Sequence, residues 1–294
     1  MGQIHSIKRP SAWQNMEQIS SRRKDGKNKA KSKTVDEESV PRVDRDMKEK
    51  RDDGAVRIVL ISDTHNKHKM LELPEGDILI HAGDFTNDGT EQEIREFDAW
   101  LASLDYQHKI VVPGNHDTGT DEKALLLQDG GQESVKVTEL RNGTLLRGEM
   151  VEVMGLRVFG LPDTLNFVGC NLWAFGAATD KELREKAGRI PSDGVDILVS
   201  HSPPWGIGDI SRTGKRCGSR GLQEVVLGAT HPPKLWTFGH VHECGGRAYR
   251  AKGTVLVNAA SFLRSEEGLR PPVVVDICKK TKELLDVRVI TKKA

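Results

Sequence analysis

The chain has 294 residues, of which 44 are basic, 43 are acidic and 36% are hydrophobic. This length suits one large domain or two modest ones. The near balance of charge excludes the one-sided electrostatics of a general nucleic-acid binder, so no extended nucleic acid is expected as a partner. The four cysteines occur singly, which fits neither a disulfide framework nor a zinc ribbon. No stretch resembles a spanning helix or a secretory signal, so a cytoplasmic location is expected.

Residues 1–53 differ in composition from the rest of the chain. They carry 14 basic and 10 acidic side chains, whereas residues 54–294 carry 30 and 33. The segment has few large apolar residues and no hydrophobic period that could bury a face. We therefore predict a disordered basic N-terminal tail over residues 1–53 and a folded domain over residues 54–294.

From residue 55 onward, short apolar runs rich in β-branched residues alternate with polar stretches of helical spacing. This pattern is typical of an α/β fold whose strands are covered on both faces. The predicted buried strands are VRIVLISD, GDILIHAGD, KIVVPGNHD, VDILVSHSPP and KLWTFGHVH. The segment EQEIREFDAWLASLD is the best amphipathic helix. Short strands around Met154–Gly155 and at the C-terminus predict antiparallel hairpins in addition to the βα units.

Side chains that bind hard or borderline metal ions follow these predicted strands. In chain order they are Asp63, His65, Asp84, Asn115, His116, Asp117, His201, His240 and His242. Ligands bind at the carboxyl ends of strands in open α/β sheets, so we expect these residues to converge. Oxygen and imidazole donors without thiolates favour Mn, Fe, Zn or Mg. The donors exceed what one ion needs, so two ions are predicted.

Each of these residues also has a purely structural interpretation. A histidine or aspartate at a strand end commonly caps a helix or stabilises a turn. On that basis five histidines are left unassigned or structural: His5, His68, His81, His108 and His231. The structural interpretation does not explain the ordered series Asp-x-His, Gly-Asp, Gly-Asn-His-Asp, His and Gly-His-x-His, every member of which lies at a strand end.

The motifs ISDTH, LIHAGDFT, VVPGNHD, VSHSPP and FGHVHE resemble those of the calcineurin-like metallophosphoesterase superfamily, and within it the metallophosphoesterase-domain (MPPED, UPF0046-like) subfamily. The resemblance implies a four-layer α/β/β/α sandwich of two mixed β-sheets flanked by helices, with a dinuclear metal site at the C-terminal edge of the strands. The ligands that it implies are Asp63, His65 and His242 for the first ion, Asn115, His201 and His240 for the second, and Asp84 as the bridge. His116 matches the catalytic histidine of the family.

The expected function is a dinuclear metal-dependent phosphohydrolase, most simply a phosphodiesterase, with cyclic nucleotides as one suggested substrate class. Two cations would activate a bridging hydroxide as nucleophile and stabilise the charge that develops on phosphorus-bound oxygens. His116 would protonate the leaving group, which is typically worth about 10² to 10⁴-fold. Asp117 would either orient the His116 ring or stabilise the turn after Gly-Asn-His.

Substrate contacts are less defined by the sequence. The partner expected is a small phosphoester, and Trp205, Phe85 and Trp173 are candidates for a wall against a nucleotide base. The arginine-rich segment 205–221 is either a substrate loop or a solvated surface loop. The rival functions are a phosphomonoesterase, including a protein phosphatase, and a membrane-tethered adaptor with a structural metal centre.

The first six residues, MGQIHS, match the N-myristoylation pattern with Gly2 as acceptor. A basic cluster follows over residues 22–33, and one acyl chain plus a polybasic patch suffices for stable membrane attachment. Peripheral membrane contact is therefore a second hypothesis, against the alternatives of a plain solvated tail and a nuclear address.

Replacing Gly2 by Ala removes the acyl acceptor and leaves the basic cluster unchanged. We expect the Gly2→Ala protein to move from the membrane to the soluble fraction when cells are fractionated, because stable attachment takes both the acyl chain and the basic cluster. Gly26→Ala, elsewhere in the tail, is the control. An unchanged distribution would remove the lipid hypothesis.

Overall fold

The computed structural model describes residues 36–38, 42–44, 54–128, 136–166, 173–263 and 268–291. Residues 36–38, 42–44 and 290–291 are described by their backbone alone. The basic cluster and Gly2 lie outside these ranges, so the membrane hypothesis stays a prediction. Within the described ranges, no helix has the length and apolar character that a bilayer crossing requires.

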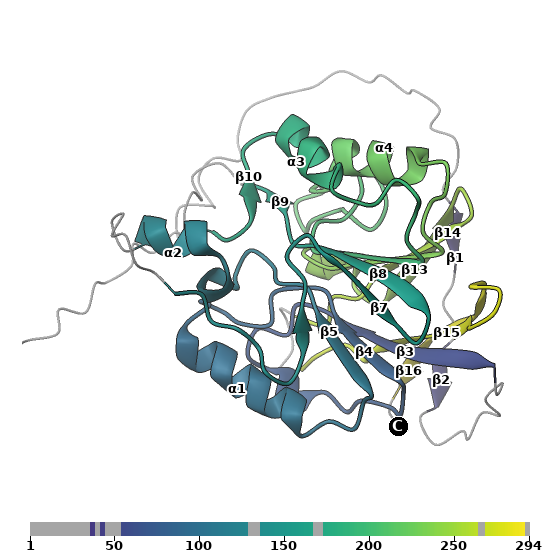
Figure 1. Cartoon of the computed structure of the whole chain (residues 1–294), viewed down its shortest axis with the longest axis horizontal. Coiled ribbons are helices and arrows are strands. Elements are labelled where there is room, and N and C mark those ends of the chain that lie inside the picture. The colour runs from purple at the N-terminus through teal and green to yellow at the C-terminus, as the bar shows by residue number, and fades with distance from the viewer. Residues whose placement is uncertain are drawn as a thin grey trace, which may run out of the picture. The chain divides into compact units, whose positions relative to one another are not determined.

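Two seven-stranded mixed sheets form the framework of the fold (Figure 1). The first contains, in spatial order, β1 (Asp36–Glu38), β13 (Arg247–Ala251), β14 (Thr254–Asn258), β12 (Leu235–Phe238), β11 (Ile197–Ser200), β8 (Leu156–Leu161) and β7 (Met150–Val153). The second contains β2 (Arg42–Asp44), β16 (Leu284–Thr291), β15 (Val273–Cys278), β3 (Ala55–Ile61), β4 (Ile78–His81), β5 (His108–Val111) and β6 (Thr144–Leu145). A separate parallel pair joins β9 (Thr164–Leu165) and β10 (Gly176–Ala177).

The helices are α1 (Glu91–Ala102), α2 (Glu122–Gln128), α3 (Asp180–Ala187) and α4 (Arg220–Gly228), with 3₁₀ turns η2 (His68–Met70), η3 (Thr118–Thr120) and η4 (His242–Cys244). In Figure 1, α3 and α4 lie over one outer face and α1 lies over the other. Three apolar clusters correspond to this layering: one between the sheets, one under α3 and α4, and one under α1. The predicted α/β/β/α sandwich of two mixed sheets is confirmed.

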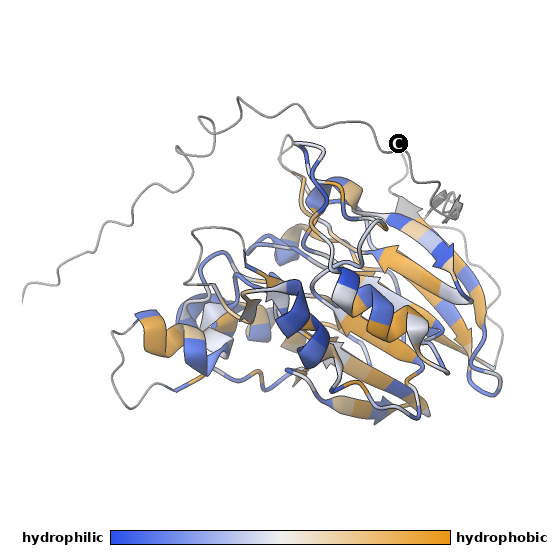
Figure 2. Ribbon diagram, turned by 90° about the horizontal axis from the view of Figure 1, so that it is seen from above, coloured by the Kyte–Doolittle hydropathy of each residue, from blue (hydrophilic) through white to orange (hydrophobic). Residues whose placement is uncertain are grey.

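The alternation of side chains along a strand explains why the predicted strands read as continuous apolar runs. In β3, Ile58 and Leu60 enter the cluster between the sheets, while Val59 and Ile61 enter the cluster under α1. Successive side chains of a strand point to opposite faces, and here both faces are covered. Figure 2 shows the apolar residues concentrated in the strands.

The amphipathic segment forms α1 as the sequence predicts. Its buried side chains are Ile94, Phe97, Trp100 and Leu101, and they pack under the second sheet. Thr90 and Glu93 form a capping box at its start, which satisfies two otherwise unpaired backbone amides. The helix is therefore fixed at its N-terminus by local bonds and along its length by burial.

The predicted hairpins are also present. Strands β7 and β8 pair antiparallel around Met154–Gly155, and β15 pairs antiparallel with β16. The strands that precede the predicted metal ligands pair in parallel instead: β3 with β4, β4 with β5, and β11 with β12. Their carboxyl ends consequently point the same way within each sheet.

Two short strands lie within residues 1–53, where the composition predicts none. Strand β1 pairs with β13, and β2 pairs with β16, each at an edge of a sheet. Edge pairing uses backbone groups and needs no apolar side chain, so a hydrophobicity pattern does not reveal it. The other residues of that segment lie outside the described ranges, and the domain boundary at residue 54 stays a prediction.

Candidate metal centre

The predicted ligands converge at the edge where the central strands of both sheets end. Asp63 and His65 follow β3, Asp84 follows β4, and Asn115 follows β5 in the second sheet. In the first sheet, His201 follows β11, and His240 and His242 follow β12. A backbone hydrogen bond of 2.8 Å from the Ser261 amide to the Ser62 carbonyl joins the two sheets beside this edge. Residues far apart in sequence thus become neighbours, as expected for strand ends.

Three overlapping groups of donor atoms each fall within 4.8 Å. They are Asp63 with His65 and His242, His65 with Asp84 and His116, and Asp84 with His201 and His240. Asp84 and His65 each belong to two of the groups. The Oδ2 atom of Asp84 lies 3.9 Å from Nε2 of His65 and 3.2 Å from Nε2 of His201, so this carboxylate faces donor atoms from both ends of the cluster.

The first group consists of Asp63, His65 and His242. The Nε2 atom of His242 lies 3.1 Å from Oδ1 of Asp63 and 3.3 Å from Nε2 of His65. Asp63 is fully buried, and its carboxylate also accepts hydrogen bonds of 3.0 Å from the His240 amide. Two imidazole nitrogens and a carboxylate that point at one another fit a shared cation.

The second group consists of Asp84, His201 and His240, with Asn115 beside it. Nε2 of His201 lies 3.2 Å from Oδ2 of Asp84 and 3.2 Å from Oδ1 of Asn115. The other nitrogen, Nδ1, lies 2.8 Å from the carbonyl oxygen of Ala82, which fixes Nδ1 as the protonated nitrogen. Nε2 is therefore directed at the shared centre, which is the orientation that a metal-ligating histidine needs.

Burial and mutual charge shift the pKa values of these groups strongly. Burial raises the pKa of Asp84, but the His201 imidazolium more than offsets burial and holds it well below its ordinary range. Burial lowers the pKa of His201, but the charge of Asp84 and their hydrogen bond raise it to about 9. Burial lowers the pKa of His65 to about 4 and that of His240 to about 3. A cation bound between Asp84 and His201 would displace the His201 proton, so metal binding is coupled to proton release.

The backbone at the site is strained. Asp63, His65, Asp84 and His240 have φ values of 52°, 43°, 56° and 66°, in the left-handed region that residues with a side chain rarely adopt. Each such residue costs on the order of 1–3 kcal/mol, and such strain clusters at functional sites. Four of the predicted ligands share this conformation. The turns after the strands therefore hold a strained backbone that directs these side chains into the cluster.

Two glycines leave room for the side chains of His201 and Asp63 to lie directly against the backbone of the turns. A Cβ at Gly83, which has φ +102°, would lie 2.2 Å from Nδ1 of His201, and one at Gly239 would lie 2.1 Å from Oδ2 of Asp63. Neither ligand could keep its position against such a contact. The Gly-Asp and Gly-His pairs of the sequence motifs are thus explained by space at the site.

His116 lies at the rim of the cluster. Its ring packs edge-on against that of His65, with centroids 4.7 Å apart, and its Nδ1 atom lies 2.7 Å from the carbonyl oxygen of Asn87. A carbonyl oxygen only accepts, so Nδ1 carries a proton and Nε2 is left for a substrate. His116 and His242 are partly exposed whereas Asp63, Asp84 and His201 are buried, so the cluster has a floor and an open side.

Asp117 does not orient the His116 ring. Its buried carboxylate accepts hydrogen bonds from the backbone amides of Asp84 (2.9 Å), Thr86 (2.9 Å) and Gly114 (2.7 Å), and from the Thr86 hydroxyl. Of the two sequence-based alternatives, the turn-stabilising one fits these bonds, because carboxylate oxygens occupied by several amides are unavailable to the ring. Burial and the nearby Asp84 charge raise the pKa of Asp117 to about 7.

The three aromatic residues that the sequence suggested as a wall against a nucleotide base lie in different environments. Phe85 is fully buried and stacked on Phe97 in the cluster under α1, so its proposed role as a base wall is wrong. The ring of Trp205 is covered by Arg220, with the guanidinium carbon 4.3 Å from its centroid. Trp173 packs edge-on against His116 at 4.0 Å.

The sequence analysis missed Phe262, whose ring centroid lies 5.2 Å from that of His65 and 5.0 Å from that of His242. Phe262 follows β14, a strand without a ligand at its end, so motif spacing gives no signal for it. It supplies an apolar wall beside the first group.

The donor set fits divalent cations that prefer oxygen and nitrogen ligands. The three donor groups contain carboxylates and imidazoles and no thiolate. Cys244 follows His242 closely, but its Sγ lies 3.5 Å from the Ile210 carbonyl oxygen. Such a donor set is typical of Mn, Fe, Zn or Mg rather than of a soft-metal site.

Comparisons with known proteins agree with this geometry. Residues 56–244 match the family model for calcineurin-like phosphoesterases. The human metallophosphoesterase domain-containing protein 1 is 36% identical over 76% of this chain and 72% of its own length. A UPF0046 protein of Caenorhabditis elegans is 34% identical over 76% of this chain and 82% of its own. A probable glycerophosphodiester phosphodiesterase, GpdQ of Arcobacter nitrofigilis, is 25% identical over 63% of this chain and 71% of its own.

Gly83→Ala tests whether close approach at the site is required for metal binding. The new Cβ would displace His201, so we expect divalent metal affinity to fall by about 10 to 100-fold, the range typical of disturbed supporting residues. The measurement is metal titration of the chelated protein by calorimetry.

Gly253→Ala is the matched control for Gly83→Ala. Gly253 also has a positive φ, +82°, but a Cβ there would meet nothing within 4 Å. The Gly253→Ala protein therefore has the same kind of backbone strain without a steric clash, and we expect its metal affinity to be unchanged. Equal losses in both variants would show that the space beside His201 is not needed.

Proposed function

This chain belongs to the calcineurin-like phosphoesterase family, and from that premise we propose that it is a metal-dependent phosphodiesterase that uses a pair of cations at the centre described above. The family implies metal-dependent hydrolysis of phosphoesters. The observation that carries the proposal is the position of the Asp84 carboxylate between His65 and His201, with the His116 ring packed against that of His65.

The proposed roles follow from the contacts of each residue. Asp63, His65 and His242 would hold one ion, Asn115, His201 and His240 the other, and Asp84 both. When bound, such a pair supplies an activated water and neutralises charge on the phosphoryl oxygens. Mn, Fe, Zn and Mg all suit this donor set. The number of ions, two, is part of the proposal.

His116 is proposed as the general acid. The carbonyl of Asn87 holds its Nδ1 proton, so that Nε2 of the imidazolium is the nitrogen that can donate to a leaving oxygen. The partial exposure of His116 allows its proton to be replaced from solvent after each turnover. Asp117 acts on this step only through the turn that it stabilises.

A diester substrate is favoured by the relative named as a probable glycerophosphodiester phosphodiesterase. Cyclic nucleotides remain one class within this proposal.

Hydrolysis of two chromogenic esters tests the function. We expect the Mn²⁺-loaded protein to hydrolyse bis(p-nitrophenyl) phosphate faster than p-nitrophenyl phosphate, and chelation to abolish both rates. His116→Gln should lower kcat by about 10² to 10⁴-fold because it removes the proton donor. Its metal content should stay unchanged, since His116 is not among the proposed ligands.

The control is His231→Gln, an exposed histidine for which we expect unchanged kcat. A faster monoester rate would replace the proposal with a phosphomonoesterase. A metal-loaded protein inert on both esters and on phosphopeptides, yet still able to bind a partner, would establish the adaptor instead.

A further inference from the structure

A buried histidine that the proposed mechanism does not use precedes one of the turns that carry metal ligands. His81 is the last residue of β4, and it has no exposed surface. Its ring packs edge-on against those of Phe85 and Phe97 in the apolar cluster under α1, with centroids 6.0 and 5.3 Å away. A polar ring in such surroundings is costly unless its nitrogens are hydrogen-bonded, so its partners indicate its role.

Both ring nitrogens of His81 are hydrogen-bonded, each to a different ligand-bearing turn. Nδ1 lies 3.3 Å from the amide nitrogen of Gly83, in the turn after β4. Nε2 lies 3.0 Å from Oγ1 of Thr64, in the turn after β3. An amide only donates, so Nδ1 accepts, and Nε2 carries the proton that is donated to the Thr64 hydroxyl. Burial lowers the pKa of His81 to about 3, which keeps the ring in this neutral form.

The turn after β4 has a backbone that needs such support. Gly83 and Asp84 are consecutive residues with positive φ values, 102° and 56°. Each of their amides donates to a buried side chain. The Gly83 amide donates to His81, and the Asp84 amide donates to Asp117 at 2.9 Å. Two side chains from different parts of the chain therefore hold this pair of residues in its unusual conformation.

The same turn contacts proposed ligands from both sheets. The carbonyl oxygen of Gly83 accepts a hydrogen bond of 2.8 Å from the Asp63 amide. That of Asp84 accepts one of 3.1 Å from the His65 amide. The carbonyl oxygen of the residue before Gly83 accepts the Nδ1 proton of His201 at 2.8 Å. A shift of this turn would consequently move ligands in both groups of the centre.

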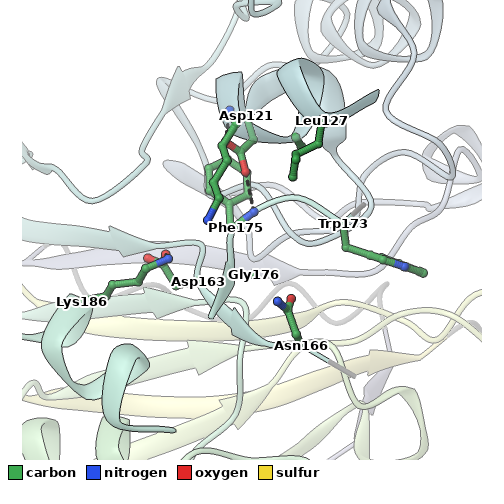
Figure 3. A pocket seen from close by; sticks show the side chains of 10 residues that line it. Asp121, Leu127, Asp163, Asn166, Trp173, Phe175, Gly176 and Lys186 are labelled. Carbon is green, nitrogen blue, oxygen red and sulfur yellow. Dashed lines mark hydrogen bonds and ion pairs between the residues drawn. The ribbon is translucent and has the colours of Figure 1, made fainter. Parts of the chain in front are cut away.

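His81 acts through the turns and not by meeting a ligand. Its ring has no exposed surface, and it does not line the hollow of about 120 Å³ drawn in Figure 3, whose walls include Trp173 and Phe175. The bonds of both ring nitrogens go to a backbone amide and to a hydroxyl of the turns. His81 is therefore a positioning residue.

We propose that His81 fixes the spacing of the two ligand-bearing turns after β3 and β4, and thereby raises the affinity of the centre for divalent cations. The proposal rests on the proposed function, because it takes the residues of these turns to be metal ligands. Without the ring, the Gly83 amide and the Thr64 hydroxyl lose their common partner, and the turns can relax towards ordinary backbone conformations. Binding a cation would then have to restore the strained conformation, which lowers the affinity.

Calorimetric titration of the chelated full chain with Mn²⁺ tests the proposal without any substrate. His81→Leu fills the apolar cluster and removes both hydrogen bonds, so we expect its Mn²⁺ affinity to fall by about 10 to 100-fold. His81→Gln keeps a donor within reach of Thr64, and His81→Asn keeps an acceptor at the position of Nδ1. Both amide variants should retain more affinity than His81→Leu. If the ring only filled space, this order would be reversed, because leucine suits an apolar cluster better than an amide does.

The matched control is His68→Leu. His68 packs against the same Phe97 ring, with centroids 5.3 Å apart, and is also buried. Neither of its ring nitrogens has a hydrogen-bond partner among the residues that the structure describes, so leucine removes no bond there. We expect the Mn²⁺ affinity of His68→Leu to be unchanged. Equal losses in His68→Leu and His81→Leu would show that packing in the cluster matters and the bonds of His81 do not, and would overturn the proposal.

Nitrogen NMR of the wild-type, metal-free protein gives a second test, which does not depend on the folding of a variant. We expect the His81 ring, assigned through its own side-chain carbons, to have an unprotonated Nδ1 and a protonated Nε2 at neutral pH. The opposite tautomer would overturn the proposal, because Nδ1 could not then accept the Gly83 amide.

These outcomes are distinct from those that test the proposed function. Wild-type Mn²⁺ affinity in His81→Leu would overturn the positioning role of His81 even if the protein hydrolyses diesters. The expected order of affinities in a protein that hydrolyses no ester would support the positioning role and overturn the function.

Discussion

The structure depends on the placement of two buried carboxylates and a set of imidazoles together at the edge where the strands of both sheets end. Asp63, Asp84 and His201 are almost without solvent contact, and removing such groups from water is costly unless opposite charge compensates them. Within the protein the compensation is a proton on His201 beside Asp84. A pair of divalent cations would replace that proton and satisfy the remaining donor atoms at the same time.

The fold supplies the geometry that this arrangement needs. Parallel strands in the centre of each sheet end at a common edge, and their apolar runs are fixed by burial on both faces. The turns that follow are strained at Asp63, His65, Asp84 and His240 and opened by glycines. The stability of the sandwich thus supports a set of local conformations that would be unfavourable in isolation.

Much of the framework could be predicted from the sequence. The continuous apolar runs gave the central strands, because strands covered on both faces leave that pattern, and the helical spacing of Ile94, Phe97 and Leu101 gave α1. The convergence of the ligands followed from their positions at strand ends, whereas their division between two ions was implied by the family resemblance. Strands β1 and β2 were missed because edge pairing is made by the backbone.

The surroundings of the site were less predictable because they depend on packing between distant segments. Phe262 reaches His65 and His242 from the loop after β14, and the residues of that loop follow no period that points to the site. Phe85 was placed beside a ligand by sequence proximity, yet its ring is stacked on Phe97 of α1 and not on the metal centre. The partners of Asp117 were equally hard to predict. Its position next to His116 in the sequence does not decide whether its carboxylate accepts a hydrogen bond from the His116 ring or from backbone amides.

The central claim is that Asp84 lies between two cations, and anomalous X-ray diffraction from crystals of the Mn²⁺-loaded protein tests it most directly. The account predicts two anomalous peaks about 3.5–4 Å apart, one on each side of the Asp84 carboxylate. A single peak, or peaks away from Asp84, would contradict it.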